Sequence, residues 1–225
     1  MRWQSDSYTG NMADNYLEKR FEEVFGKGPK SPKTPQRPSL DTLLLRNRSI
    51  RGFKKEHIVH PRQMRVIVDV NAKIPSGMNQ QALRFRIITK GPEADEVNRH
   101  IKMGAALPEL NLPFPGTEPE AFIIVASEKP ESPILDIDLG ISLQSMLLKA
   151  VELGLNGLII RNFDKEGLSK GLGLPEAMVP LCVLAIGKSA ETVKLVEASE
   201  GDSLKYYREE GIHYVPKIKV DDLLF

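Results

Sequence analysis

The sequence contains very little cysteine, no long hydrophobic run and almost no net charge. Its 225 residues include one cysteine, Cys182, so no internal disulfide can form. No apolar run approaches the roughly 18 residues of a membrane span, and the first twenty residues lack the apolar core of a secretory signal. Because 31 Lys and Arg face 30 Asp and Glu, the net charge of +1 argues against a strongly basic nucleic-acid-binding protein. We therefore expect a protein of a reducing, cytoplasmic compartment.

The common signatures of phosphate-binding loops, hydrolases and metal sites are also missing. Gly187-Lys188-Ser189 ends like a phosphate-binding loop, but Cys182 occupies the position of its first glycine. Gly140-Ile141-Ser142 begins like the nucleophile turn of a hydrolase, but the second glycine is absent. The histidines show no metal-binding spacing beyond His57 and His60, which we interpret as solvated. The sequence features that remain are basic segments suited to anion binding and a loop rich in amide side chains.

The N-terminal region, residues 1–39, differs in composition from the rest of the chain. Residues 14–25 have the apolar spacing of a short helix. Residues 26–38 hold four prolines, four basic residues and no acidic residue, which is typical of an extended linker. This arm is either a solvated segment or a basic tail that docks on an acidic partner. We accordingly divide the chain into an arm, residues 1–39, and a folded domain, residues 40–225.

From Leu40 onward the sequence has the periodicity of a folded domain. The spacing predicts helices over residues 40–45, 61–70 and 138–153. Apolar runs predict strands over residues 85–89, 121–126, 157–160 and 181–186. Because strands alternate with helical patterns, we expect an α/β or α+β fold in which helices pack on a sheet.

The longest predicted helix, residues 138–153, is apolar around most of its circumference. Its polar residues form one narrow stripe, made of Ser142, Ser145, Lys149 and Glu152. A helix of this kind is buried on most sides, at the centre of a fold or at a subunit interface. Gln144 lies outside the stripe, so we expect a buried amide that bonds to neighbouring backbone or contacts a ligand.

A basic segment, residues 46–53, contains three arginines and a serine within six residues. Arginine guanidinium groups match the oxygens of a phosphate in a bidentate way. The segment therefore predicts an anion site, with a charged surface turn as the alternative interpretation.

Two further segments carry polar chemistry. Residues 75–81 form a turn-rich loop that ends in three amides ahead of a strand. Amides offer donors and acceptors to the edge of a planar polar ligand, although an ordinary helix–strand loop explains them too. In residues 213–219, Lys217 and Lys219 are two positions apart, so an extended strand would point both to one face. Two more positive charges there would complete a phosphate site.

Taken together and in this order, these segments resemble the FMN-dependent nitroreductase family, from about Leu40 to Phe225. RNRSIRGF resembles the family's Arg-Arg-Ser-x-Arg segment, and PSGMNQQALRF resembles its Pro-Ser-x-x-Asn-x-Gln-Pro-Trp loop. IDLGISLQSMLLKAVELGLNG, PLCVLAIGK and VPKIKVDDLLF resemble its central helix, the strand before its C-terminal arm and its closing basic strand. The resemblance implies an α+β fold, a three-layer sandwich with a mixed or antiparallel sheet flanked by helices. It also implies an intertwined homodimer with two FMN sites at the subunit interface.

The resemblance further implies which residues bind FMN. Arg48, Ser49 and Arg51 are expected to hold the phosphate and the pyrimidine edge of the flavin. The loop is expected to line the isoalloxazine ring, the segment after residue 160 to cover its other side, and the C-terminal strand to complete the phosphate site. These further residues are Pro75, Ser76, Met78, Asn79, Gln81, Arg161, Asn162, Lys217 and Lys219.

The sequence departs from the family pattern at three places. Asn47 replaces the first arginine of the basic segment, and Ala82-Leu83 replaces Pro-Trp after the loop. Residues 101–119 are short and proline-rich, whereas larger family members shape their substrate pocket there. The resemblance therefore leaves the acceptor open.

The function implied is that of an FMN-dependent NAD(P)H oxidoreductase. Hydride passes from NAD(P)H to the flavin and then, in ping-pong exchange, to a nitroaromatic, quinone or similar acceptor. No catalytic side chain, metal, nucleic acid or membrane is expected. The alternatives are a flavin-binding carrier or sensor without turnover, and an interaction protein that docks a partner through residues 27–38.

Overall fold

The computed structural model describes residues 19–20, 23–24, 38–105 and 107–225. The chain divides into two units, Met1–Arg37 and Pro38–Phe225. In the first unit, Lys19, Arg20, Glu23 and Val24 are helical, and the rest of the predicted helix over residues 14–25 lies outside the described residues. The predicted linker, residues 26–38, lies outside them as well, apart from Pro38. The role of the arm therefore stays a prediction.

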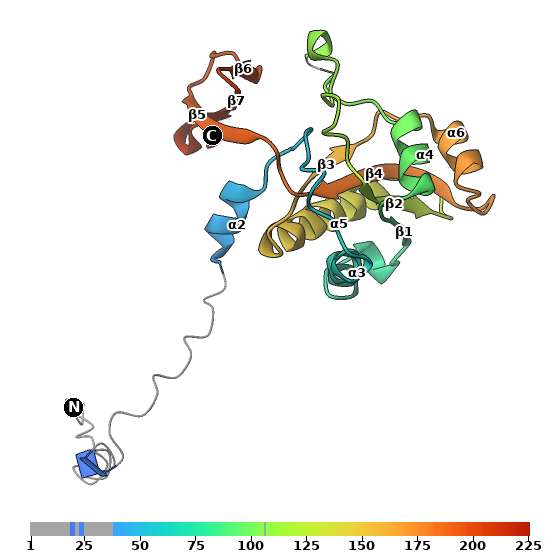
Figure 1. Ribbon diagram of the computed structural model, residues 1–225, viewed down its shortest axis with the longest axis horizontal. Helices are drawn as coiled ribbons and strands as arrows, with labels where there is room; N and C mark the ends of the chain where they lie inside the picture. The colour runs from blue at the N-terminus through green and yellow to red at the C-terminus, as the bar shows by residue number, and fades with distance from the viewer. Residues whose placement is uncertain (1–18, 21–22, 25–37, 106) are drawn as a thin grey trace. The chain divides into compact units, whose positions relative to one another are not determined.

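The second unit is built on a four-stranded antiparallel sheet (Figure 1). Its strands are β1 (Leu83–Ile88), β2 (Ala121–Ser127), β3 (Asn156–Ile160) and β4 (Val179–Gly187), in the order β1-β2-β4-β3. All four strands predicted from apolar runs are confirmed, with ends that differ by at most two residues. The mixed helix and strand content of the unit makes it an α+β fold.

Helices cover both faces of this sheet, because the two central strands are apolar on both sides. On one face, Ile123 and Val125 of β2 pack with α3 (Pro61–Val68) and α5 (Pro133–Glu152). On the other face, Phe122 and Ile124 pack with α4 (Pro92–His100) and α6 (Lys165–Gly171). Alternate side chains of a strand point to opposite faces, so the continuous apolar run of β2 serves both cores. Full burial of each such side chain contributes about 1.5–3 kcal/mol.

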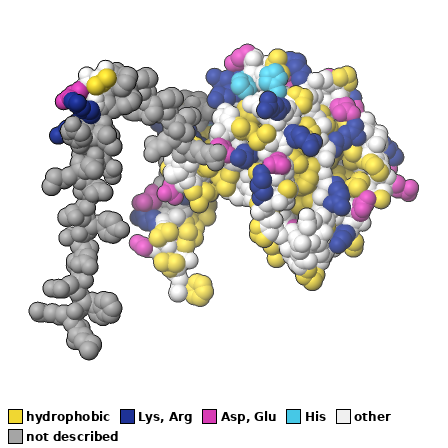
Figure 2. Space-filling view, turned by 90° about the horizontal axis from the view of Figure 1, so that it is seen from below, with side chains coloured by type: hydrophobic (Ala, Val, Ile, Leu, Met, Phe, Trp, Pro, Cys, Tyr) yellow, Lys and Arg dark blue, Asp and Glu magenta, His cyan; other side chains and the backbone are white. Residues whose placement is uncertain are grey.

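The central helix α5 begins five residues earlier than the spacing predicts. Ser132 caps it by accepting a hydrogen bond from the Leu135 amide at 3.2 Å, and Pro133 occupies its first turn. The side toward the sheet is buried, but Ile134 and Ile137 on the other side are 38% and 63% exposed. Figure 2 shows hydrophobic side chains gathered at the surface of the domain. Within one chain, α5 is therefore buried on one side and leaves Ile134 partly exposed and Ile137 largely exposed on the other.

The remaining elements of the second unit are helix α2 (Leu40–Arg46) and a separate C-terminal sheet. Helix α2 is capped by Ser39, which accepts from the Thr42 amide, and confirms the helix predicted there. The C-terminal region forms a separate three-stranded sheet in the order β5-β7-β6. Its strands are β5 (Thr192–Ala198), β6 (Tyr207–Glu209) and β7 (Ile212–Ile218), of which β5 and β7 are parallel. Glu210 and Gly211, both at positive φ, make the tight turn between β6 and β7.

Short 3₁₀ turns complete the architecture: Asp69–Ala72, Gly77–Asn79, Pro108–Leu110 and Val220–Leu223. The first continues α3, so the helix predicted over residues 61–70 ends as a tighter turn. In the described part of the chain, no helix combines the length and apolarity of a membrane span.

Candidate functional site

The basic segment, residues 46–53, is held in place by its two buried apolar residues, Ile50 and Phe53. Ile50 and Phe53 are buried in the core beside β3 and β4. The Ile50 amide donates to the Gly157 carbonyl at 3.1 Å, and Phe53 forms an isolated bridge with Ser189. A Cβ at Gly157 would lie 2.5 Å from the Ala185 carbonyl oxygen, so only glycine allows this close approach. With its apolar residues inside, the segment presents its arginines at the surface.

These arginines open on a cavity of about 360 Å³, which we call the basic cavity. It lies between the basic segment, α5, the edge strand β3 and the C-terminal sheet. Of the residues predicted to bind FMN, the structure brings four to this cavity: Arg48, Ser49, Arg51 and Lys217. Its other lining residues are Leu44, Asn47, Gln144, Leu147, Ile159, Val193, Tyr206, His213 and Val215.

The arginines of the basic cavity keep donors that no described group satisfies. Arg48 donates through Nη2 to the Leu44 carbonyl at 2.5 Å, and burial lowers the pKa of its guanidinium. Arg51 lies 5.0 Å from the centre of the Tyr206 ring, and its Nη2 donates to the Tyr206 hydroxyl at 3.5 Å. The Nε atoms of both arginines are buried without a partner among the described residues. Buried N–H groups of this kind favour an anionic ligand that accepts from them.

A largely buried ion pair links the C-terminal sheet to the basic segment beside the cavity. Glu191 accepts from Arg208 Nη2 at 2.6 Å and from the Arg51 amide at 3.3 Å. The side chains of Glu191 and Arg208 are only 7% and 17% exposed. The carboxylate thus compensates Arg208 and fastens the C-terminal sheet to the basic segment. Arg48, Arg51 and Lys217 remain as the positive charge that faces the cavity.

Among the lining residues that were not predicted as cofactor contacts, His213 is the most deeply buried polar one. His213 on β7 is 2% exposed, and neither ring nitrogen has a hydrogen-bond partner among the described residues. Its ring lies 5.1 Å from that of Tyr206 in an edge-on arrangement. The alternation of His213, Val215 and Lys217 along one strand could have indicated that His213 faces the same side as Lys217. Its burial could not have been predicted, because it depends on tertiary packing.

Lys219 does not reach the basic cavity, although we expected it to share a face with Lys217. Strand β7 ends at Ile218, and Lys219 immediately precedes the 3₁₀ turn Val220–Leu223. Its Nζ lies 3.3 Å from Glu197 Oε1. In the single chain Lys219 therefore pairs with a carboxylate of the neighbouring strand β5 and does not line the basic cavity.

Gln144 is an exposed residue of α5 and lines the basic cavity, so the expected burial of its amide is wrong. Its Oε1 accepts from Asn47 Nδ2 at 3.3 Å, a side chain rather than neighbouring backbone. Contact with a ligand stays a prediction. The buried polar residues of this helix are instead Asp138 and Ser142, and the Ser142 hydroxyl donates to Asn71 Oδ1 at 2.5 Å.

The predicted ring-binding loop lines a second cavity of about 230 Å³, which we call the loop cavity. Pro75, Ser76 and Gln81 lie in its wall, together with residues of α5 and β1. Three residues of the loop have left-handed backbone: Met78 (φ 49°), Asn79 (φ 52°) and Gln81 (φ 46°). Such conformations cost roughly 1–3 kcal/mol each and persist only where surrounding contacts enforce them.

The loop is held in this strained form by α5. Asp138, which is 5% exposed, accepts from the Gly77 amide at 2.7 Å. The Ser76 hydroxyl accepts from the Gln81 amide at 2.9 Å, which closes the turn. A Cβ at Gly77 would lie 2.4 Å from a methyl group of Ile134, so the loop packs directly on the helix. The outcome is that Met78 and Asn79 project from the loop, with Met78 strongly exposed.

Met78 and Asn79 line neither cavity, and the two cavities have no lining residue in common. Within one chain, the structure therefore does not bring the loop and the basic segment together. Asn79 instead accepts through Oδ1 from Gln81 Nε2 at 3.1 Å.

Arg161 and Asn162 also lie outside both cavities, in the link between β3 and α6. Arg161 Nη1 lies 3.6 Å from Asp136 Oδ1 on the first turn of α5. The Asn162 carbonyl accepts from the Lys102 amide at 2.9 Å. The link is thus fixed both to α5 and to the segment that follows α4.

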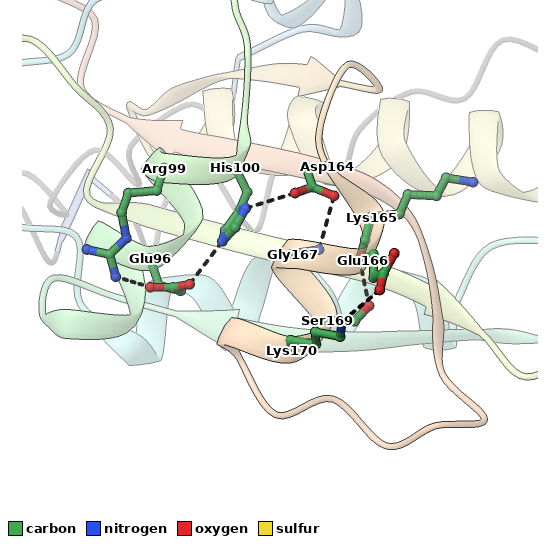
Figure 3. Close-up of polar contacts among 9 residues, drawn as sticks. All are labelled: Glu96, Arg99, His100, Asp164, Lys165, Glu166, Gly167, Ser169 and Lys170. Atoms are coloured by element: carbon green, nitrogen blue, oxygen red, sulfur yellow. Dashed lines mark hydrogen bonds and ion pairs between the residues drawn. The ribbon is translucent and has the colours of Figure 1, made fainter.

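A polar cluster anchors the far end of this link (Figure 3). His100 of α4 lies between two carboxylates, with Nε2 at 2.9 Å from Glu96 Oε1 and Nδ1 at 3.5 Å from Asp164 Oδ2. Asp164 also caps α6 by accepting from the Gly167 amide at 3.0 Å, and this bond is the first cause of its lowered pKa. The cluster joins α4 to α6 and so fixes where the link after β3 ends. Among the described residues, no group of His, Cys, Asp and Glu has the arrangement of a metal site.

Comparison with known families decides what kind of protein this arrangement belongs to. The model of the nitroreductase family matches residues 44–188, which include the basic segment, the loop and α5. The chain belongs to the nitroreductase family. The nitroreductase match ends before β5, so the C-terminal sheet with His213 and Lys217 lies outside it.

Solved structures with the nitroreductase fold resemble this chain over most of their length. An FMN-dependent nitroreductase from Clostridium difficile has 20% identity and a TM-score of 0.54, covering 66% of this chain and 87% of that one. A Staphylococcus epidermidis protein named as an NAD(P)H:FMN oxidoreductase has 18% identity and a TM-score of 0.57, covering 72% and 92%. An Exiguobacterium sibiricum protein, named as a nitroreductase and crystallised with FMN, has 19% identity and a TM-score of 0.57, covering 68% and 90%. No curated protein matches the chain. At these identities the similarity shows the fold.

Proposed function

We propose that this protein is an FMN-dependent oxidoreductase that takes electrons from NAD(P)H and passes them to a nitroaromatic, quinone or similar acceptor. The observation that supports this most is the basic cavity, where Arg48, Arg51 and Lys217 converge and two guanidinium N–H groups are buried without a partner. The phosphate of FMN fits such a set of donors, because it is dianionic and accepts several hydrogen bonds. The names of the similar structures from Clostridium difficile and Staphylococcus epidermidis agree with this choice of cofactor and electron donor.

The proposed protein is a homodimer in which α5 lies at the subunit interface. Ile134 and Ile137 on α5 and Leu44 and Leu45 on α2 are exposed in the single chain, and burying them against a second copy would be favourable. A dimer also offers a reason why the two cavities are separate in one chain. We propose that the loop of the partner subunit, residues 75–81, completes the site that the basic cavity begins.

In this proposal the residues bind and orient the cofactor and contribute no acid or base. FMN, when bound, supplies the hydride transfer. Arg48, Arg51 and Lys217 would hold its phosphate and thereby fix the position of the ring. The amide of Asn79 and the backbone N–H groups of the loop would donate to polar atoms at the edge of the ring, where negative charge develops on reduction. The strained backbone held by Asp138 would keep these donors in position before the cofactor arrives.

Replacing both arginines tests this assignment. In Arg48→Ala/Arg51→Ala the cavity loses two guanidinium groups, and each lost charge-assisted hydrogen bond is worth about 1.5–3 kcal/mol. We expect the purified variant to lose its flavin and to bind added FMN at least about a hundredfold more weakly.

The measurement is flavin content after gel filtration, followed by a fluorescence titration with FMN. The matched control is Arg46→Ala, a neighbouring arginine outside the basic cavity, which should keep its flavin. Full retention of FMN in the double variant would refute the role of these two residues. Bound flavin that NADH and NADPH do not reduce would favour the carrier or sensor instead.

A further inference from the structure

His213 is the most deeply buried polar side chain of the basic cavity. It is 2% exposed, lines the cavity and has no hydrogen-bond partner on either ring nitrogen among the described residues. Buried imidazoles normally satisfy at least one nitrogen, since an unpaired buried polar group costs about 1–3 kcal/mol. An unpaired ring that faces a cavity is therefore a group prepared for a ligand.

The surroundings of the ring indicate which ligand atoms it would meet. Arg51, Arg208 and Glu191 are the charged groups that act on it, and the Tyr206 ring packs against it. Glu191 is already engaged by Arg208 and by the Arg51 amide. The charge left without compensation near the imidazole is that of Arg51, so an anionic oxygen is the favoured neighbour.

The imidazole would serve as a neutral donor in this position. Burial, followed by the nearby charges of Arg208 and Arg51, lowers its pKa, and Glu191 opposes this only in part. A neutral imidazole carries one N–H, which can donate to a phosphate oxygen without adding a further charge to the cavity. His213, Val215 and Lys217 alternate along β7 and line the same cavity, so one strand would supply a donor and a cation to one ligand.

We propose that His213 donates a hydrogen bond to the phosphate of the flavin nucleotide and so helps the cavity select FMN over riboflavin. This inference rests on the proposed function, because it takes a flavin as the ligand. It adds a phosphate contact on the C-terminal sheet, which lies outside the part of the chain matched by the family model.

The test compares FMN with riboflavin, which has the same ring and ribityl chain but no phosphate. In His213→Phe the ring shape is retained without the donor, and Kd for FMN should rise by about 10- to 100-fold, as for a lost hydrogen bond to a charged group. Kd for riboflavin should change by less than about threefold. His213→Gln, which restores an N–H donor, should recover most of the affinity for FMN.

Val215→Ala is the matched control, since it changes the lining of the same cavity without touching a polar group. It should affect FMN and riboflavin alike, and thermal unfolding should show that all variants are folded. A second readout is the imidazole ¹⁵N resonance of His213 in the wild-type protein, which should shift with FMN and stay unchanged with riboflavin.

Each possible result decides the matter. Equal losses for FMN and riboflavin in His213→Phe would overturn the inference and place the contact on the ribityl chain or the ring. Unchanged FMN binding in His213→Phe would overturn it as well, while leaving the proposed function intact. A wild-type protein that binds neither flavin would overturn both.

Discussion

At the scale of single residues, the basic cavity contains buried polar groups that have no hydrogen-bond partner within the described chain. Arg208 and Glu191 form an ion pair at 2.6 Å. The Nε groups of Arg48, Arg51 and Arg208 and both ring nitrogens of His213 nevertheless lack hydrogen-bond partners among the described residues. Such groups lower the stability of the flavin-free protein and raise its affinity for an anion. The same residues should therefore be visible in stability measurements without any ligand.

The pH dependence of folding gives one such measurement. The pKa of His213 is lowered from 6.5 in the folded chain, first by burial and then by Arg208 and Arg51. As the pH falls through about 6.5, the unfolded chain binds a proton on this histidine before the folded chain does, so the free energy of unfolding decreases. Urea unfolding of the flavin-free protein should show this loss between about pH 7.5 and about pH 5.5.

His213→Gln removes the titrating group, so its stability should fall less over the same interval. Above about pH 7.5 the free energies of unfolding of the two proteins should vary with pH in the same way, because His213 is neutral there in both the folded and the unfolded state. Parallel curves for wild type and His213→Gln throughout this range would show that the pKa of His213 is not lowered.

At the scale of elements, α5 carries most of the architecture of the site. Its first half holds the loop through Asp138 and Ile134, its first turn contacts Arg161, and its middle supplies Gln144 to the basic cavity. The start of this helix therefore affects the position of the loop.

Loss of the helix cap tests how much the start of α5 contributes to stability. In Ser132→Ala the Leu135 amide loses its acceptor, and we expect a loss of about 1 kcal/mol in the free energy of unfolding. Ser132→Asn retains a capping oxygen and should be close to wild type. The measurement is urea unfolding followed by circular dichroism; equal stability of Ser132→Ala and wild type would show that the cap contributes nothing.

The elements that could be predicted from the sequence are those with a continuous or strictly periodic apolar pattern. AFIIVA and LCVLAI are apolar on both faces because β2 and β4 are central in the sheet, and this makes them recognisable. The start of α5 was placed too late because Asp136 and Asp138 interrupt the apolar pattern and Pro133 precedes them. Strands β5 and β6 were missed because their side chains are largely exposed and only pairing with β7 orders them.

The candidate site was predictable to the extent that local motifs define it. Arg48, Ser49, Arg51 and Lys217 were named from the sequence, and the fold brings them to one cavity. His213 was missed because its burial, and its place in one cavity with the basic segment far earlier in the chain, arise only from tertiary packing. The role of Lys219 stays a prediction, because in the single chain its side chain lies beside Glu197 and does not line the basic cavity.

At the scale of the whole molecule, the single chain has features of an incomplete assembly. Its two cavities are separate, the strained loop projects Met78 outward, and α5 exposes Ile137. Apolar side chains grouped in this way on a central helix are typical of an interface between subunits. The proposed homodimer accounts for these features together.

A charge placed on the exposed face of α5 should disrupt this assembly. In Ile137→Lys a cation would be buried at the interface, so we expect the protein to become monomeric and to lose most of its flavin. Ile58→Lys is the control, since Ile58 is similarly exposed but lies before α3. Sedimentation velocity reports the oligomeric state; a wild-type protein that is monomeric while it retains FMN would contradict the proposed dimer site.

The most direct test of the central claim is the visible absorption spectrum of the purified protein, before and after anaerobic addition of NADH and NADPH. The proposed function predicts a yellow protein whose flavin bands between about 350 and about 500 nm bleach when one of the two donors is added. The FMN released on denaturation should be equimolar with the chain. A colourless protein that takes up no FMN on incubation would contradict the account.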